Sequence, residues 1–352
     1  MPANAPASFG TLPSGDAVTA HTLSNDRGLQ LVVLDLGATL QSLCVTDATG
    51  ELVELTLGFD DAEGYVQAGN PYLGATVGRY ANRIADASFV LDGTRHDLSA
   101  NEGPTCLHGG VDGFHARLWS VLDATPSSIT LRLVSPDGDQ GFPGELTVTA
   151  TYAIEGDSVV LTYEATTDAP TVVSLTNHTY FDLGGPGGGG VDAHHLTVQS
   201  DAYLPVDARS VPEGAVESVT GTPLDLTTSV PLRDRVRAGH PQVALVSGID
   251  HTFVLQGNGD RTVARLEHPA SGRTLEVATD QPSIQVYTGN RLDGALLGRG
   301  GTLLRQGDGI CLETQQLPDA PNQPQFPSTV LRPGETYRAR TRWTLSTRPG
   351  QP

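Results

Sequence analysis

The sequence predicts an all-β fold, a sandwich or a barrel of many short strands with few short helices. The chain has 41 Gly and 24 Pro among 352 residues, a density that disfavours long helices because both residues are costly inside them. Between these residues, apolar and polar side chains alternate in runs of about four to eight, as in strands bounded by turns. Many short strands with no helix longer than about two turns favour a sandwich or barrel.

The expected strands are spread along the whole chain. They cover residues 29–34, 87–91, 128–134, 146–154, 158–165, 171–175, 195–200, 262–267, 274–278, 283–287 and 337–345. The dipeptide Asp92-Gly93 predicts a tight hairpin within 91–98. Residues 60–68 are the best candidate for a short helix.

No linker rich in Pro, Ser or Gly divides the chain, so we expect one domain over residues 1–352. All-β folds often reach this length as one domain. Residues 1–8 are expected to form a loose N-terminal segment. The Gly-rich stretch 184–190 predicts a loop tip, because a phosphate cradle would need a strand–loop–helix context.

The charge of the chain restricts its partners. The net charge of −19 disfavours binding to nucleic acid, which needs a basic footprint, and to anionic membrane surfaces. All 21 basic residues are Arg. The absence of Lys excludes a Schiff-base lysine, a lysine-anchored pyridoxal phosphate and a P-loop lysine.

The cysteines and the N-terminus indicate a cytoplasmic protein. Cys44, Cys106 and Cys311 are odd in number and widely spaced, which is typical neither of a disulfide framework nor of a thiolate zinc site. The start of the chain has no basic and apolar pattern of a signal peptide. No run of about 18 apolar residues predicts a membrane span.

One candidate for chemistry lies in "LTNHTYFDLGG" (175–185). If this segment is a strand, His178 and Tyr180 project from the same face, which places an imidazole beside a phenol. A half-buried strand with a satisfied polar face explains a lone His equally well.

A second candidate is Glu313 in "GICLETQQLPDAPNQPQFPS" (309–328). Strand alternation puts Cys311, Glu313 and Gln315 on one face. A carboxylate in so apolar a run must be paired or have a raised pKa. A structural ion pair with an arginine is the alternative. The Pro residues that follow predict a stiff, extended wall.

Several further polar residues are weak candidates on their own. They are Arg79, Asn82, Arg83, His108 before a Gly pair, Asp250 beside His251, and Gln281, Gln285 and Tyr287. No His-x-x-x-His, His-x-His or Cys pair has metal-ligand spacing, so we expect no metal. A serine triad would lack its Gly-x-Ser-x-Gly elbow.

Taken together, these segments resemble the aldose 1-epimerases, or galactose mutarotases, nearly end to end. The similarity begins in residues 9–43 and continues through "LGFDDAEGY" (57–65), "VGRYANRI" (77–84), "CLHGG" (106–110), "NHTYFDL" (177–183), "GIDHTF" (248–253), "QPSIQVYTGN" (281–290) and "CLETQQLPDAPNQPQFPS" (311–328). Eight blocks in the family's order make a specific match. The resemblance implies a large antiparallel β-sandwich with few short helices, the galactose mutarotase-like supersandwich, with a cleft on one face.

The resemblance also implies an activity and a set of site residues. The family interconverts the α and β anomers of free aldohexoses such as galactose and glucose, without cofactor or metal. By position, Glu313 matches the general base and His178 the general acid. The sugar-binding positions match Asn82, Arg83, His108, Asp250 and Gln281, and strand alternation adds Tyr180. A His with a pKa near its reference value of about 6.5 would suit this role.

Two alternatives stay open. A hexose 6-phosphate epimerase on the same fold would need additional Arg to hold the phosphate. A non-catalytic sugar-binding protein would typically lack Glu313 or His178, and both are present. The sequence does not rank galactose, glucose, xylose and arabinose. We expect a monomer, with a homodimer as the alternative, and a small-molecule sugar as the partner.

Overall fold

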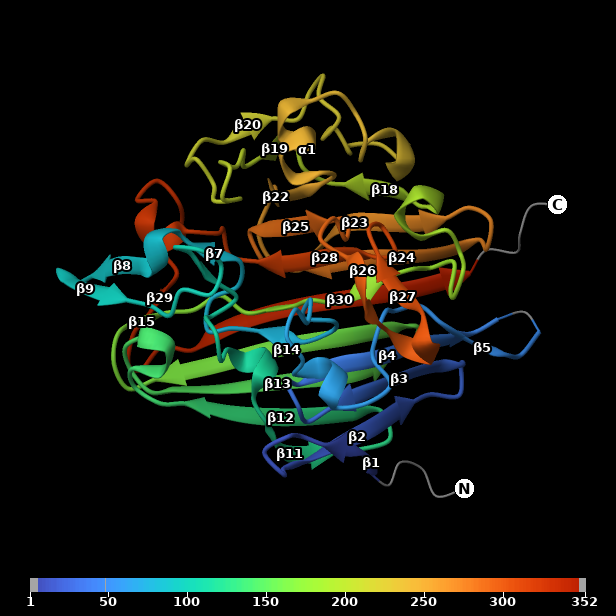
Figure 1. Ribbon diagram of the computed structural model, residues 1–352, viewed down its shortest axis with the longest axis horizontal. Helices are drawn as coiled ribbons and strands as arrows, with labels where there is room; N and C mark the ends of the chain where they lie inside the picture. Colours follow the sequence, from blue (N-terminus) through green and yellow to red (C-terminus); the bar gives the residue numbers. More distant parts are fainter. Residues whose placement is uncertain (1–5, 48, 348–352) are drawn as a thin grey trace.

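The computed structural model describes residues 6–47 and 49–347, which are built almost entirely of strands (Figure 1). The all-β prediction is confirmed. Within the described residues, three large sheets form, and every strand pairing inside them is antiparallel. One apolar cluster takes side chains from all three, for example Leu31, Val148 and Phe253. The largest sheet therefore packs against both of the others as a sandwich.

The largest sheet has nine strands, and its long central members form one layer of the sandwich (Figure 1). In order across the sheet they are β11 (Ser120–Ala124), β12 (Ser128–Ser135), β13 (Leu146–Glu155), β14 (Ser158–Thr167), β30 (Tyr337–Thr347), β24 (Arg273–Thr279), β23 (Arg261–His268), β18 (His195–Val198) and β21 (Val230–Pro231). Alternation is plain in β13, where the side chains from Leu146 to Ile154 are buried at every second position.

The other layer contains a five-stranded and a six-stranded sheet. The first comprises β1 (Ala7–Thr11), β2 (Ala17–Ser24), β3 (Leu29–Leu34), β4 (Thr39–Thr46) and β5 (Leu52–Glu54). The second runs in the order β17 (Tyr180–Phe181), β28 (Ile310–Gln315), β25 (Ser283–Tyr287), β22 (Asp250–Val254), β19 (Ala202–Tyr203) and β20 (Glu217–Ser218). The six-stranded sheet is the one that positions the candidate site.

Short two-stranded ribbons connect these sheets. They pair β6 (Thr76–Val77) with β16 (Thr176–Asn177), β7 (Arg83–Ile84) with β10 (Cys106–Leu107), β8 (Ser88–Leu91) with β9 (Thr94–Asp97), β15 (Thr171–Val172) with β29 (Val330–Leu331), and β26 (Asp293–Leu297) with β27 (Leu303–Arg305). The expected hairpin at Asp92-Gly93 is the β8–β9 turn, where Leu91 pairs with Thr94. The expected strands 29–34 and 283–287 match β3 and β25 at both ends.

Helical structure is limited to short turns in the described part of the chain. The one α-helix is α1 (Pro241–Val246), and the 3₁₀ turns are η1 (Glu63–Tyr65), η2 (Ala85–Ala87), η3 (Phe114–Ala116), η4 (Asp139–Gly141), η5 (Gly190–Ala193), η6 (Leu232–Asp234), η7 (Arg299–Gly301) and η8 (Ala320–Asn322). The helix candidate 60–68 is only the turn η1. No helix among the described residues is both long and apolar enough to cross a membrane.

The N-terminal segment differs from its expectation. Residues 1–5 lie outside the described residues, but Ala7 and Ser8, expected to be loose, begin β1. Ala7 pairs with Ala20 and Ser8 with Thr19, so the ladder to β2 orders them. The single-domain expectation for 1–352 stays a prediction.

Candidate active site

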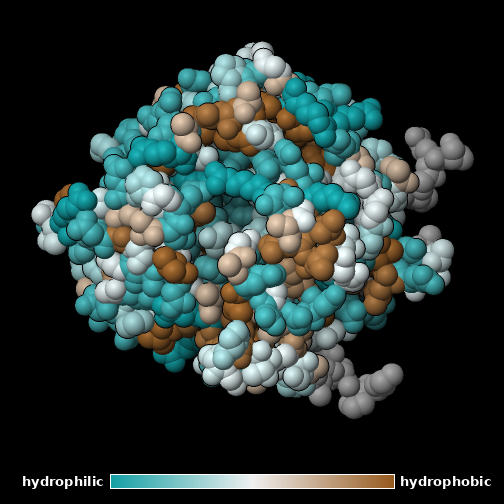
Figure 2. All heavy atoms as spheres, in the orientation of Figure 1, coloured by the Kyte–Doolittle hydropathy of each residue, from teal (hydrophilic) through white to brown (hydrophobic). Residues whose placement is uncertain are grey.

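A cleft of about 220 Å³ opens over the six-stranded sheet. It is lined by Gly69, Pro71, Tyr72, Asn82, Arg83, Glu102, Leu107, His108, His178, Tyr180, Asp250, Tyr287, Arg291 and Glu313. Figure 2 shows a hollow near the centre of this face, surrounded mainly by hydrophilic residues. The volume lies below the roughly 300–1,000 Å³ typical of pockets for drug-sized ligands, so it suits one small ring.

Strand β28 places Glu313 on the floor of this cleft. Alternation puts Cys311, Glu313 and Gln315 on one strand face, and Gln285 of β25 lies directly opposite Glu313. The Glu313 side chain is 2% exposed, and its Oε2 has no hydrogen-bond partner among the described residues. Burial raises the pKa of Glu313 well above its usual value; the charge of Asp250 adds to this and Arg83 opposes it.

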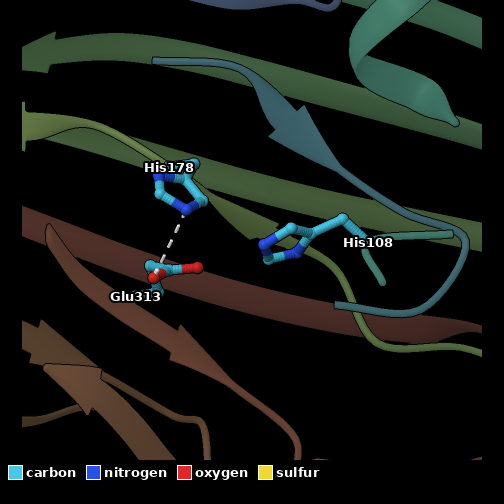
Figure 3. Close-up of side chains that lie close together, drawn as sticks. All are labelled: His108, His178 and Glu313. Carbon is cyan, nitrogen blue, oxygen red and sulfur yellow. Dashed lines mark ion pairs between the residues drawn. The ribbon is translucent and has the colours of Figure 1, made fainter. Parts of the chain in front are cut away.

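His178 faces Glu313 from a break between two short strands. β16 ends at Asn177 and β17 begins at Tyr180, so the expected continuous strand is interrupted here. The backbone N–H of His178 donates to Ala75 O, and its carbonyl accepts from Gly74 N, both at 2.9 Å. These bonds fix the imidazole with Nε2 3.8 Å from Glu313 Oε1 (Figure 3).

The environment of the His178 ring controls its protonation. The ring stacks on Tyr180 at 5.1 Å between centroids, and Cys311 Sγ lies 3.4 Å from Nδ1. Burial raises the pKa of the Cys311 thiol, so the S–H can donate to Nδ1 and leave the ring proton on Nε2. Burial also lowers the pKa of His178 to about 4. The expectation of a value near 6.5 is therefore wrong, because the ring has lost its solvation.

His108 completes a cluster of rings around Glu313. It follows β10 with φ of 52° and is succeeded by Gly109, where a Cβ would lie 2.0 Å from Gly78 O. Nδ1 of His108 accepts the backbone N–H of Asn82 at 3.2 Å, so the neutral ring carries its proton on Nε2. Its ring centroid is 5.2 Å from that of His178, and Figure 3 shows both rings directed toward Glu313.

A bidentate ion pair holds Arg83 in the cleft wall. Its Nε and Nη2 donate to the two carboxylate oxygens of Glu102 at 2.5 and 2.8 Å. Arg291 also donates to Glu102 Oε1. Burial raises the pKa of Glu102, but the guanidinium groups of Arg83 and Arg291 outweigh this effect and lower it overall. The carboxylate of Glu102 therefore stays ionised.

Asp250 begins β22 and is held by a hydrogen-bonded relay. Thr252 Oγ1 donates to Gln285 Oε1 at 2.5 Å, and Gln285 Nε2 donates to Asp250 Oδ1 at 2.7 Å. All three side chains are buried. The relay fixes the Gln285 amide, and through it the direction of the Asp250 carboxylate. Burial raises the pKa of Asp250, while Arg83 and the Gln285 bond oppose the shift.

The structure brings seven of the eight residues expected from sequence to this cleft and leaves one outside it. Gln281 is absent from the cleft lining; its amide binds Asp280 at 2.7 Å and Gln316 at 3.0 Å. The weak candidate Arg79 is also outside the lining. It is buried and donates to Ser135 Oγ and to the carbonyls of Pro143 and Gly144.

Sequence reasoning missed Tyr72, Glu102 and Arg291. The Tyr72 ring lies 4.7 Å from that of His108 and 5.8 Å from that of His178. Glu102 and Arg291 are 189 residues apart, so no local pattern links them. Turn residues lie next to each of these three positions in the sequence, but turn residues are too common to identify a site.

A metal ion is sterically possible at the centre of the cleft. One ligand atom each from His108, His178 and Glu313 lies within 4.8 Å of the others. Two imidazoles and a carboxylate are a donor set that zinc accepts. The expectation that the site takes no metal and no cofactor therefore stays a prediction.

Comparison with known proteins shows the family of this chain. The family model described as aldose 1-epimerase matches residues 19–344. This chain belongs to the aldose 1-epimerase family. The galactose mutarotase of Bos taurus is 45% identical to it over 331 residues, covering 94% of each chain. The aldose 1-epimerase of Escherichia coli K12 is 38% identical over 336 residues, covering 94% of this chain and 96% of its own.

Solved structures of the family have the same architecture. An aldose epimerase homologue from C. elegans superposes with a TM-score of 0.87 at 31% identity, covering 94% of this chain and 99% of its own. Galactose 1-epimerase from Lactobacillus acidophilus gives 0.85 at 28% identity, covering 99% of both chains. Family membership, read from the blocks that carry His178 and Glu313, is confirmed.

Proposed function

We propose that the cleft interconverts the α and β anomers of free aldohexoses such as galactose and glucose, with Glu313 as general base and His178 as general acid. The observation that carries this proposal is the buried pair of a carboxyl and an imidazole, 3.8 Å apart, in a cleft sized for one sugar ring. Membership of the aldose 1-epimerase family supports it.

The reaction needs two proton transfers. Glu313 takes the proton of the C1 hydroxyl while His178 gives a proton to the ring oxygen, and the bond between C1 and the ring oxygen breaks. The open-chain aldehyde then rotates about the C1–C2 bond. Ring closure on the other face of the carbonyl returns both protons. Positioned acid–base groups typically contribute about 10²–10⁴-fold.

The pair works with one proton in total. In the empty cleft, burial favours the neutral groups, which puts this proton on Glu313. A sugar hydroxyl that donates to the unpartnered Glu313 Oε2 stabilises the carboxylate. Binding of the sugar thus moves the proton toward His178, whose Nε2 faces Glu313. The two groups titrate as a coupled pair.

The charges of the cleft favour a neutral sugar over a phosphorylated one. The lining carries the carboxyl groups of Glu313, Asp250 and Glu102 against the guanidinium groups of Arg83 and Arg291. Both guanidinium groups are already bound to Glu102. A phosphate dianion would meet no uncommitted arginine among the described residues of this lining, whereas hydroxyl groups can both donate to Asp250 and accept from His108.

The proposal is tested by polarimetry of freshly dissolved α-D-galactose and α-D-glucose. The wild type should accelerate equilibration of both sugars, and Glu313→Gln should lose at least about 100-fold of that acceleration. Glu164→Gln is a matched control, because Glu164 pairs with Arg338 on the exposed surface. A folded Glu313→Gln variant with the wild-type rate would exclude Glu313 as the base. A folded wild type without acceleration would contradict the function itself.

A further inference from the structure

Tyr72 lines the cleft in a backbone conformation that is unfavourable for an aromatic residue. Its φ is 63°, in the left-handed region that residues with a Cβ rarely adopt. The backbone N–H of Tyr72 donates to Asn70 Oδ1 at 3.1 Å, and its carbonyl accepts from Ala75 N at 3.0 Å. Such conformations persist only where surrounding contacts enforce them, and they gather at functional sites. The placement of the Tyr72 side chain therefore asks for a functional reason.

The Tyr72 ring lies among three imidazoles. Its centroid is 4.7 Å from those of His108 and His115, both in edge-to-face contact, and 5.8 Å from that of His178. His108 and His178 are buried, whereas Tyr72 is partly exposed. Tyr72 is therefore more superficial than the two buried imidazoles that it contacts.

Aromatic rings surround His178. Ring centroids lie 5.1 Å away for Tyr180, 5.2 Å for His108, 5.8 Å for Tyr72 and 6.1 Å for Tyr287. Tyr180 and Tyr287 are buried, so of these three tyrosines Tyr72 is the one that separates His178 from solvent. Tyr180 Oη also donates to the carbonyl of Pro71 at 3.0 Å, which ties the Tyr72 segment to the ring that stacks on His178.

The Tyr72 ring acts on His178 through hydration and not through charge. The titratable groups that face the His178 ring are Glu313 and Cys311 of β28, Tyr180 of β17, Tyr287 of β25, His108 after β10, His115 of η3 and Tyr72 itself. The phenols stay neutral, because burial raises the pKa of all three tyrosines. Removing the Tyr72 ring would thus admit water without changing the charge around His178.

We propose that Tyr72 is a positioning residue whose ring shields the His178 imidazole from water and holds it opposite Glu313. The effect on rate rests on the proposed epimerase function, whereas the shielding is a property of the sugar-free protein. Water at the ring would solvate the charged imidazole and compete with Glu313 for Nε2. The ring and not the hydroxyl carries this role, since Tyr72 Oη has no hydrogen-bond partner among the described residues.

The first test is an NMR titration of His178 in the sugar-free protein. Tyr72→Gly removes the ring and suits the left-handed backbone, so its fold should be retained. It should raise the pKa of His178, which burial lowers to about 4, by at least about one pH unit toward 6.5. Tyr72→Phe keeps the ring and should leave this pKa unchanged. Phe9→Ala removes a ring that contacts Tyr65 outside the cleft lining and serves as the control.

The second test is the pH profile of galactose mutarotation. In Tyr72→Gly we expect kcat/KM to fall as the pH drops from 7 to 5, because His178 then gains its second proton in this range. At pH 7 the loss of ring placement should lower kcat by about tenfold. Tyr72→Phe and Phe9→Ala should both follow the wild-type profile.

The outcomes separate this inference from the function on which its rate effect rests. A wild type that does not accelerate mutarotation would contradict the proposed function, while the NMR titration would still decide the shielding. An unchanged His178 pKa in Tyr72→Gly, with circular dichroism like that of the wild type, would overturn the inference alone. A Tyr72→Phe enzyme as impaired as Tyr72→Gly would also overturn it, because the hydroxyl would then be the active group. A raised pKa in Tyr72→Gly that is absent in Tyr72→Phe is the supporting result.

Discussion

At the scale of single residues, His178 depends most on its surroundings. It stacks on Tyr180, its Nδ1 lies 3.4 Å from Cys311 Sγ and its Nε2 points at Glu313. These contacts fix one ring orientation, in which the thiol can donate to Nδ1. An Asn in its place could still form hydrogen bonds but could not exchange a proton near neutral pH.

We therefore expect His178→Asn to lower kcat by about 100-fold or more, because a general acid is lost. Initial rates of galactose mutarotation measure this directly. His96→Asn serves as the control, since His96 stacks on Phe89 outside the cleft lining. A His178→Asn enzyme as fast as the wild type would exclude His178 as the acid.

The lowered pKa of His178 predicts an unusual pH profile. In the free enzyme burial raises the pKa of Glu313 and lowers that of His178 to about 4, so the one proton of the working pair resides on Glu313 while His178 is neutral. The pair loses its base function only when His178 also gains a proton, near pH 4. We expect kcat/KM, which reports the free enzyme, not to fall as the pH drops from 7 to 5. A falling limb with a midpoint near 6.5 would contradict this environment for His178.

At the scale of elements, strand register places the chemistry. The pairing of β25 with β28 sets Gln285 opposite Glu313, and the pairing of β22 with β25 sets Thr252 opposite Gln285. Side chains on one face of adjacent strands become neighbours. The relay from Thr252 to Asp250 follows from this register.

The relay predicts a binding defect when its first donor is removed. Thr252→Val keeps the shape of the side chain but removes the hydroxyl, so the Gln285 amide loses its anchor and Asp250 its fixed orientation. We expect KM for galactose to rise about tenfold with a smaller change in kcat, since a hydrogen bond to a charged group contributes about 1.5–3 kcal/mol. Thr252→Ser retains the donor and should remain close to wild type. Equal KM values for the Thr252→Val variant and the wild type would show that the relay does not orient Asp250.

Element prediction succeeded where alternation is regular and failed where it is interrupted. The face shared by Cys311, Glu313 and Gln315 is visible in the sequence because β28 is an unbroken strand. The break between strands at His178 is not visible in the sequence, because backbone hydrogen bonds between His178 and the distant residues Gly74 and Ala75 create it. The helix α1 (Pro241–Val246) has no strong periodic pattern in its six residues.

At the scale of the whole molecule, buried imidazoles couple folding to pH. Burial lowers the pKa of His115, His178 and His194 to about 4 and that of His251 to about 3. The unfolded chain binds these protons near pH 6.5, so each contribution to stability is complete above that pH and is lost as the pH falls toward the folded-state pKa. The raised pKa of Glu313 has the opposite effect, because its contribution to folding stability increases as the pH falls.

The contribution of His251 to this pH dependence of stability can be measured separately. Between pH 7.5 and 5 it should account for about 2 kcal/mol of lost stability, from a pKa of 6.5 in the unfolded chain. Urea unfolding at both pH values should therefore show a smaller loss in His251→Gln than in the wild type. His96→Gln, on the periphery, should show the wild-type loss. The same loss in His251→Gln as in the wild type would contradict a neutral buried His251.

Local alternation and turn residues along the chain are enough to predict the all-β class and most strand positions. The family, and with it the shared site of Glu313 and His178, follow from the resemblance of the sequence blocks to the aldose 1-epimerases. Only the tertiary structure decided that His178 has a low pKa, that Gln281 lies outside the cleft, and that Glu102 meets Arg291 at its mouth. Desolvation and ion pairing depend on which distant segments pack together, and no local pattern encodes that packing.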